Sequence, residues 1–349
     1  MSRKQKGNSQ KTIPEVFQNR LKEIFGPGLF LEINKTFIER PTTFRVNTIK
    51  AKREEVLESL QREGFKIKNV PWYRDAFILQ NKTKRELGES DLYSNGKIYI
   101  QSLASMAPPL VLDPTPGEKV LDLTAAPGSK TSQIAALMGC QGELVANDNN
   151  KPRFFKLKHN MEALGVATAS HPLDGGSPTP HLSPFLKGEG DDSSWVFSLR
   201  MEHGAALCRE YPGYFDKILL DAPCSAEARF ITDDPKTFGY WKERKIKEMA
   251  YKQRQLLFSA WGALKPGGVL VYSTCTFAPE ENELQITRLL ERNSDCEILD
   301  IGNLNINRAP MVKEWRGRRV HDEVIKKALR IMPDREMKGF FVAKVQRVG

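Results

Sequence analysis

The hydrophobic pattern of the first hundred residues predicts a small α+β module. Apolar side chains recur at helical spacing over residues 13–26, and the dipeptide Gly26-Pro27 is typical of a helix end. The elements expected after it are a strand at 42–48, a helix at 51–64 and strands at 65–70 and 76–80. This order is typical of an α+β unit, and we place the module at residues 11–96.

Residues 97–349 have a different pattern, in which strands alternate with helices. The expected strands lie at 118–123, 143–148, 217–222 and 268–275, and the expected helices at 129–139, 152–165 and 245–264. Such alternation is typical of a parallel α/β sheet covered by helices. The apolar run at 339–348 predicts a further strand, which we expect at the edge of the same sheet.

Two segments do not fit this pattern. Residues 170–199 contain four prolines and four glycines, which predicts an irregular exposed insertion between a helix and a strand of the α/β domain. Residues 1–10 are basic and polar, which predicts a disordered tail. We assign no function to the insertion.

The charge of the chain favours a polyanionic partner. The net charge is +10 and the isoelectric point is near 9.3. Residues 1–97 contain 20 Lys and Arg against 12 Asp and Glu, so +8 of the +10 lies in the tail and the N-terminal module together. We therefore expect this module to present a docking surface for nucleic acid.

Composition also argues against several classes of protein. The 349 residues contain no apolar run near the roughly 18 residues of a membrane span, and the start lacks the apolar segment of a secretory signal. The five cysteines include no C-x-x-C pair, which favours free thiols over disulfides or a zinc site. We expect a cytoplasmic, monomeric protein that binds no metal.

The segment TAAPGSKT, residues 124–131, follows the first strand of the α/β domain and opens a helix. Small residues let the backbone approach a ligand, and the N–H groups of a helix start suit a carboxylate or phosphate. Asp148 ends the next strand, 20 residues after Gly128, where a carboxylate accepts hydrogen bonds from ribose hydroxyls. The segment lacks G-x-G-x-x-G, which argues against a dehydrogenase. S-adenosylmethionine, a nucleoside with a small carboxylate at its other end, fits this pattern.

Five ordered segments carry a resemblance to a known family. They are TAAPGSKT, VAND, LLDAPCS, YSTCTFAPEENE and GFFVAK. This series resembles the successive motifs of the RNA cytosine-C5 methyltransferases, the family known as Sun or Fmu. The resemblance runs from about Arg40 to the C-terminus and includes PTTFRVNT near residues 41–48, with the insertion as its interruption.

The resemblance implies a seven-stranded, Rossmann-like methyltransferase domain that uses S-adenosylmethionine and follows an α+β RNA-binding module. The cofactor-binding residues that it implies are Thr124, Ala125, Ala126, Pro127, Gly128, Ser129, Lys130, Asp148, Arg153 and Asp221. It also implies that Arg45 and Asn47 contact RNA.

The resemblance implies catalytic roles for two thiols and a carboxylate. Cys275 attacks C6 of a cytosine, which makes C5 nucleophilic toward the methyl group, and Cys224 assists product release by helping the C5 proton to leave. Asp221 holds the pyrimidine near N3. Covalent addition divides one difficult step into easier ones, and a thiolate is a strong nucleophile for it. DNA cytosine methyltransferases use the Pro-Cys thiol instead, and by that analogy Cys224 attacks; the presence of both motifs favours Cys275.

Several positions depart from the family pattern. Thr124 and Ser129 replace the usual Cys and Gly, and Ala226 and Ala228 stand where glycines are usual. His203 precedes Gly204 where an adenine-binding Asp-Gly is expected. We expect ribosomal RNA as the substrate, with transfer RNA as the alternative. A catalytically impaired RNA-binding or ribosome-assembly protein and a DNA methyltransferase are the rival functions.

Overall fold

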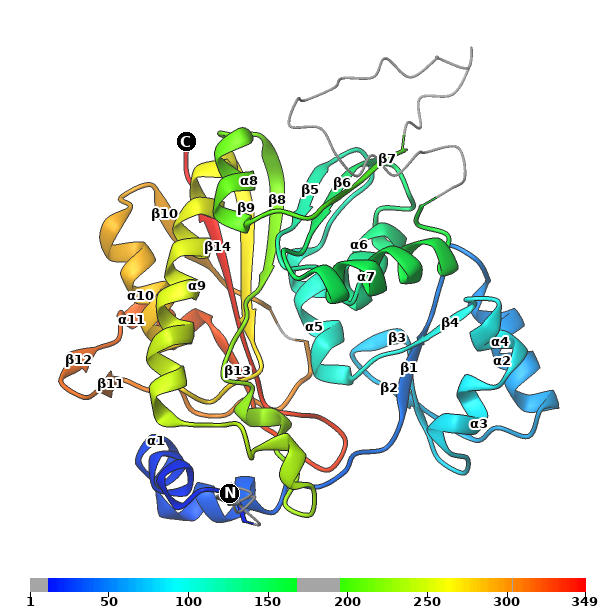
Figure 1. The fold of residues 1–349 in the computed structure, drawn as a ribbon, viewed down its shortest axis with the longest axis horizontal. Helices are drawn as coiled ribbons and strands as arrows, with labels where there is room; N and C mark the ends of the chain where they lie inside the picture. The colour runs from blue at the N-terminus through cyan, green and yellow to red at the C-terminus, as the bar shows by residue number, and fades with distance from the viewer. Residues whose placement is uncertain (1–11, 168–194, 303) are drawn as a thin grey trace, which may run out of the picture.

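The computed structural model describes residues 12–167, 195–302 and 304–349 (Figure 1). The expected basic tail at 1–10 lies outside the described residues, as does most of the expected insertion. Residues 195–199 of that insertion are described, and they belong to a strand of the large sheet, β7 (Trp195–Arg200). The insertion predicted at 170–199 therefore ends earlier than expected.

The N-terminal module is built on a four-stranded antiparallel sheet. Its strands β1 (Thr43–Val46), β2 (Ile67–Val70), β3 (Tyr73–Leu79) and β4 (Ile98–Ile100) have the order β2-β3-β1-β4. Its helices are α2 (Arg53–Arg62), α3 (Lys84–Gly88) and α4 (Asp91–Ser94). The core contains Phe44, Phe77 and Leu60. Because β4 pairs with β1, this sheet extends beyond the boundary that we placed at residue 96.

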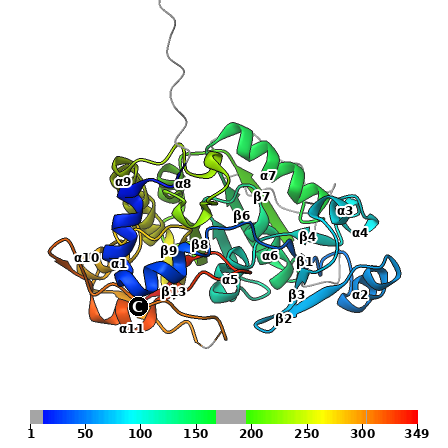
Figure 2. The same ribbon diagram turned by 90° about the horizontal axis from the view of Figure 1, so that it is seen from below.

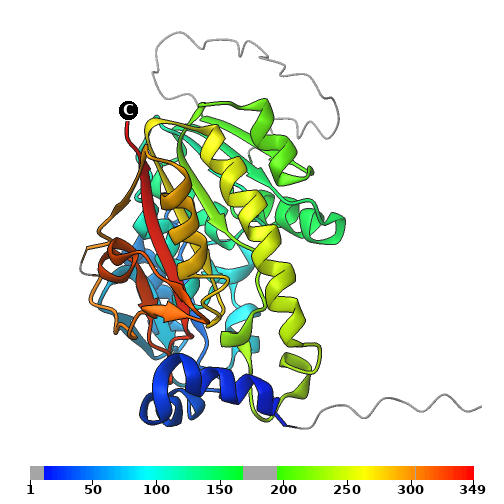
Figure 3. The ribbon, with the colours of Figure 1, turned by 90° about the vertical axis from the view of Figure 1, so that its left-hand side faces the viewer.

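The first helix, α1 (Glu15–Asn34), does not end at Gly26 as the pattern predicted. Gly26 has a φ of 76°, which bends the chain, and helical structure resumes at Pro27, a residue that the first turn of a helix accepts. Phe17 and Phe25 of α1 pack against Phe230 and Phe277 of the α/β domain. Figures 2 and 3 accordingly show α1 beside the α/β domain and apart from α2, α3 and α4.

The large sheet contains the expected parallel strands at its centre. Its strands are β5 (Lys119–Asp122), β6 (Gly142–Asn147), β7, β8 (Phe215–Asp221), β9 (Leu264–Thr274), β10 (Cys296–Leu299), β13 (Leu329–Ile331) and β14 (Phe340–Arg347). Seven of them follow the order β10-β14-β9-β8-β5-β6-β7, and β13 pairs with β14. The strands β5 to β9 are mutually parallel, whereas β14 is antiparallel to β9. Since β14 lies between β9 and two other strands, our placement of it at the sheet edge is wrong.

Helices cover both faces of this sheet. One face packs against α5 (Leu103–Leu112), α6 (Ser129–Leu137) and α7 (Lys151–Ala163). The other packs against α8 (Gly204–Glu210), α9 (Glu243–Ala263), α10 (Glu283–Arg292) and α11 (Asp322–Lys327). A small hairpin of β11 (Glu314–Trp315) and β12 (Arg318–Arg319) completes the fold. The arrangement confirms the predicted Rossmann-like α/β architecture.

No helix within the described residues combines the length and apolarity needed to cross a membrane.

Candidate active site

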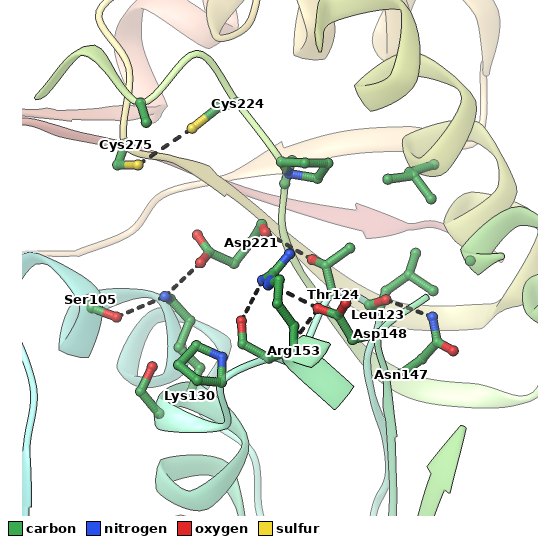
Figure 4. A pocket seen from close by; sticks show the side chains of 18 of the residues that line it. Ser105, Leu123, Thr124, Lys130, Asn147, Asp148, Arg153, Asp221, Cys224 and Cys275 are labelled. Atoms are coloured by element: carbon green, nitrogen blue, oxygen red, sulfur yellow. Dashed lines mark hydrogen bonds and ion pairs between the residues drawn. The ribbon is translucent and has the colours of Figure 1, made fainter. Parts of the chain in front are cut away.

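A single large cavity of about 1330 Å³ opens at the carboxyl edge of the parallel strands. The loops after β5, β6, β8 and β9 supply most of its lining, together with residues of α5, α8 and α9. In open α/β sheets this edge is where ligands bind. Figure 4 shows the two thiols at one end of the cavity, the Asp148–Arg153 pair at the other, and Asp221 between them.

The predicted cofactor loop, residues 124–130, lies against this cavity. Most of its members line the cavity, namely Thr124, Ala126, Pro127, Ser129 and Lys130. Ala125 and Gly128 do not; they shape the loop from behind. Gly128 has a φ of 101°, and a Cβ there would lie 2.5 Å from Cε of Met161, so glycine is needed both for the turn and for the close approach of α7.

Asp148 is buried at the end of β6, where its carboxylate contacts the cofactor loop. Its Oδ2 accepts a hydrogen bond from the backbone N–H of Ala126 at 3.3 Å and lies 3.2 Å from Nη2 of Arg153. The same guanidinium donates to the carbonyl of Ala126 at 2.5 Å. The loop, Asp148 and Arg153 therefore form one connected unit, as the predicted nucleoside site requires.

Asp221 lies at the centre of the cavity at the end of β8. Its carboxylate accepts hydrogen bonds from Nζ of Lys130 at 2.7 Å and from Oγ of Ser273 at 2.9 Å. Nζ of Lys130 also donates to Oγ of Ser105 at 2.8 Å. The hydroxyl of Thr124, the residue that replaces the usual Cys of the family pattern, donates to the backbone carbonyl of Asp221 at 2.8 Å.

The two thiols, separated by 51 residues in sequence, face each other across 3.4 Å between their sulfur atoms. Adjacent parallel strands bring them together, because β8 ends just before Cys224 and β9 just before Cys275. The hydrogen bond from Cys224, helped by the positive charges of Arg229 and Lys130, lowers the pKa of Cys275. The same hydrogen bond, with burial and the charges of Cys275 and Glu281, raises the pKa of Cys224. These opposite directions favour Cys275 as the more acidic of the two thiols.

A buried polar network holds the two cysteine loops together. Next to Cys224, Ser225 donates through its backbone N–H to Oε2 of Glu281 at 3.0 Å and places its hydroxyl 2.5 Å from Oε1. That hydroxyl also lies 2.7 Å from Oγ1 of Thr276, which donates to Oε2 of Glu227 at 2.8 Å. Burial raises the pKa of Glu227 and that of Glu281, the latter to about 8. The network thus contains two carboxyl groups, and the sequence motifs gave no sign of their role.

Arg45 and Asn47, the residues expected to contact RNA, lie inside the protein and do not line the cavity. Both side chains are fully buried. Arg45 donates to Oε1 of Gln101 at 3.0 Å and to Oγ of Ser132 at 2.7 Å, and Asn47 donates to the carbonyl of Leu164 at 2.9 Å. Because neither side chain has surface left for a ligand, we no longer assign RNA contacts to them. They join the N-terminal sheet to α6 and to the end of α7.

The structure also shows where the other residues that depart from the family pattern lie. His203 and Gly204 line the cavity, so an imidazole stands where the adenine-contacting carboxylate was expected. Ala226 has a φ of 59°, a conformation that strains any residue with a Cβ and explains why glycine is usual there. Trp241, a candidate base-stacking residue, is buried and donates from Nε1 to Glu227 at 3.1 Å.

Within the described residues no cluster of three or more His, Cys, Asp or Glu side chains is arranged to hold a metal ion.

Comparison with known proteins agrees with the fold and the site. A Rossmann-like methyltransferase domain is the class that the sheet and its cavity define. The chain belongs to the family described as 16S rRNA methyltransferase RsmB/F, which matches residues 109–184 and 196–346. Residues 13–103 match the N-terminal domain of 16S rRNA methyltransferase RsmF.

Curated relatives include a tRNA (cytosine(49)-C(5))-methyltransferase from Pyrococcus abyssi, which is 33% identical over 91% of this chain and 97% of that protein. Ribosomal RNA small subunit methyltransferase F from Pectobacterium atrosepticum is 33% identical over 97% of this chain. The chain spans only 63% of the length of that second relative.

Two solved structures show the same fold. A methyltransferase homolog protein from Pyrococcus horikoshii is 30% identical, with a TM-score of 0.77 over 96% of this chain and 95% of that one. NSun6 from Pyrococcus horikoshii with SFG is 22% identical, with a TM-score of 0.74 over 97% of this chain and 99% of that one.

Proposed function

We propose that this protein transfers a methyl group from S-adenosylmethionine to C5 of a cytosine in RNA, with Cys275 as the nucleophile. The observation that carries the proposal is the pair of sulfur atoms 3.4 Å apart in the cavity that also contains Asp148 and the cofactor loop. A nucleophile and a nucleoside site in one cavity suit covalent catalysis on a base.

The residues of the cavity fit S-adenosylmethionine. The Asp148 carboxylate suits ribose hydroxyls, the imidazole of His203 suits the adenine ring, and the loop before α6 suits the small carboxylate of the amino-acid part. When bound, the cofactor supplies an electrophilic methyl group. The cavity volume of about 1330 Å³ exceeds the range of roughly 300–1,000 Å³ typical of small-molecule sites, which leaves room for a cytosine beside the cofactor.

The residues at the other end of the cavity suit the base. The Cys275 thiolate forms a bond to C6, and the negative charge that develops on the ring at N3 is stabilised by the ammonium of Lys130, which the Asp221 carboxylate holds in place. Once Cys275 has become a neutral thioether, the negative charge that raised the pKa of Cys224 is gone. Cys224 can then release its thiol proton to solvent water, and the resulting thiolate accepts the C5 proton. The electron pair of the C5–H bond forms the C5–C6 double bond, and cleavage of the Sγ–C6 bond restores the Cys275 thiolate.

We propose ribosomal RNA as the substrate. The support is the match of nearly the whole chain to families described as 16S rRNA methyltransferases. Transfer RNA is the second candidate, because the relative that the chain covers almost end to end is a tRNA methyltransferase. Bisulfite sequencing of total RNA from cells with and without the protein distinguishes them by the RNA in which a 5-methylcytosine disappears.

The proposed activity is tested with radiolabelled S-adenosylmethionine and matched RNA and DNA oligonucleotides. We expect methyl transfer to RNA and its loss in Cys275→Ser, while Cys208→Ser, which changes a buried thiol that does not line the cavity, serves as the control. Transfer to DNA alone would contradict the substrate class. Absence of binding heat with S-adenosylmethionine in calorimetry would favour the rival reading, a scaffold protein.

A further inference from the structure

Two cations without an acidic partner face the cavity beside the thiols. Arg229 and Lys338 both line the cavity that contains Cys224 and Cys275. Within the described parts of the chain, neither side chain takes part in an ion pair or hydrogen bond. Lys338 is partly buried and Arg229 is exposed beside it, so this unpaired charge is available to an anionic ligand from outside the chain.

Arg229 is held on a rigid loop. It ends the short helix η1 (Glu227–Arg229), five residues after Cys224. The backbone N–H of Ala228 donates to the carbonyl of Cys275 at 3.1 Å, and the neighbouring Glu227 carboxylate accepts the N–H of Phe277 at 3.1 Å. The backbone on which the exposed guanidinium stands is therefore fixed relative to both thiols.

Lys338 approaches from a different element. A turn precedes it in which the Asp334 carboxylate accepts the N–H groups of Glu336 and Met337 at 2.7 and 2.6 Å. The next residue, Gly339, packs so closely that a Cβ would lie 2.5 Å from the ring of Phe277. This contact fixes the start of β14, and with it Lys338, against the loop of Cys275.

The surroundings of Lys338 contain several positive charges. Burial, followed by repulsion from Arg229, Arg40 and Lys84, lowers the pKa of Lys338. Arg40 donates to the carbonyls of Thr36 and Asp334, so its hydrogen bonds are already used within the chain. Lys84, at the start of α3 in the N-terminal module, is exposed. Of the other cations that line the cavity, Lys130 pairs with Asp221, Arg153 with Asp148 and Lys252 with Glu248. Arg209, which lies on α8, is a third lining cation with no ion pair within the described residues.

We propose that Arg229 and Lys338 bind the phosphates that flank the target cytidine in single-stranded RNA. The inference rests on the proposed function, because it places the base at Cys275. A base that leaves its stack to reach a buried nucleophile brings its two backbone phosphates to the mouth of the site. The guanidinium fork of Arg229 suits two phosphate oxygens, and the ammonium of Lys338 acts as a point charge.

The test measures the salt dependence of binding to a labelled single-stranded RNA oligonucleotide with one central cytidine. We expect the double variant Arg229→Ala/Lys338→Ala to bind roughly 10- to 100-fold more weakly. The slope of log affinity against log salt should fall by about 1 to 1.5, since each contact to a single strand contributes about 0.7. Arg229→Lys/Lys338→Arg should restore most of the slope, because both charges are retained.

The matched control is Arg292→Ala/Lys313→Ala, which removes two exposed positive charges of the α/β domain outside the cavity. The proposal is overturned if the cavity variant keeps the wild-type slope, or if the control loses as much. Unchanged S-adenosylmethionine binding by both variants shows that the fold is intact. Methylation of RNA by the wild type together with an unchanged slope in the cavity variant refutes only the phosphate site, whereas absent methylation by the wild type refutes the proposed function.

Discussion

The carboxyl group of Glu281 offers the sharpest test of how the two thiols are held. With a pKa of about 8 it carries a proton at neutral pH, and one ordered chain of hydrogen bonds then satisfies every group. Oε1–H of Glu281 donates to Ser225, Ser225 to Thr276, and Thr276 to the Glu227 carboxylate. Oε2 of Glu281 meanwhile accepts from the N–H of Ser225 and from Nε2 of Gln253.

Glutamine at this position reproduces the protonated form, because its NH2 group donates where the O–H did and its carbonyl accepts the same two bonds. We expect Glu281→Gln to match the wild-type free energy of unfolding within about 1 kcal/mol near pH 5 and to exceed it at neutral pH, because glutamine has no proton to lose in the unfolded chain. Near the same pH of about 5, Glu281→Ala removes three hydrogen bonds and leaves the buried N–H of Ser225 without a partner. With about 1–3 kcal/mol for that N–H and about 1 kcal/mol for each of the other two bonds, the expected loss is on the order of 4 kcal/mol. That loss is a large part of the roughly 5–15 kcal/mol of a typical domain.

The pH dependence has a definite sign. The folded-state pKa of Glu281 lies above the ordinary value of 4.5, so between about pH 5 and 8 the folded chain keeps a proton that the unfolded chain has lost. Below about pH 5, Glu281 makes its full contribution to the free energy of unfolding. This contribution falls by roughly 1 kcal/mol per pH unit as the pH rises from about 5 to 8. Glu281→Gln should flatten the slope, although Glu227, whose pKa is also raised, keeps part of it.

The measurement is urea unfolding followed by tryptophan fluorescence at several pH values, with alkylation of Cys275 by iodoacetamide as a readout of the site. The glutamine variant should keep wild-type alkylation, whereas the alanine variant should lose the selective reactivity of Cys275. Equal instability of the two variants, or a wild-type pH slope in Glu281→Gln, would refute the hydrogen-bond chain.

Three further outcomes follow from the geometry. Ala226→Gly should raise the free energy of unfolding by about 1 kcal/mol in chemical denaturation, because it relieves a φ of 59°; a loss of stability would contradict the strain. Lys130→Met should raise the pH midpoint of Cys275 alkylation, because a nearby positive charge is lost; an unchanged midpoint would contradict that contribution. Asp148→Asn should weaken S-adenosylmethionine binding in calorimetry by about tenfold with little effect on RNA affinity; equal losses of both would argue against a cofactor role.

The sequence was sufficient to locate the cavity because the cysteines and carboxylates that line it lie at or just after the ends of predicted strands. Cys224 and Cys275 each follow a short apolar run, and the carboxyl ends of neighbouring parallel strands meet at one edge. The same rule placed Asp148 beside the loop at 124–130. In these places local pattern and tertiary position agree.

Where prediction was wrong, contacts distant in sequence decide the structure. Arg45 appeared to be a surface cation, but Gln101 and Ser132, from elements far along the chain, bury it. The four consecutive apolar residues 340–343 of β14 are typical of an interior strand and could have corrected its placement at the edge. The sequence pattern did not predict that α1 packs on the cysteine loops, because the apolar face of an amphipathic helix does not specify which surface it covers.

The account depends most directly on which thiol bonds to the base. Cys224→Ala, incubated with S-adenosylmethionine and a cytidine-containing RNA substrate, should accumulate a covalent protein–RNA adduct that survives a denaturing gel. Peptide mapping by mass spectrometry should place the nucleotide on Cys275, and the double variant Cys224→Ala/Cys275→Ala should give no adduct. An adduct that forms instead in Cys275→Ala, with the nucleotide on Cys224, would contradict the assignment of the nucleophile.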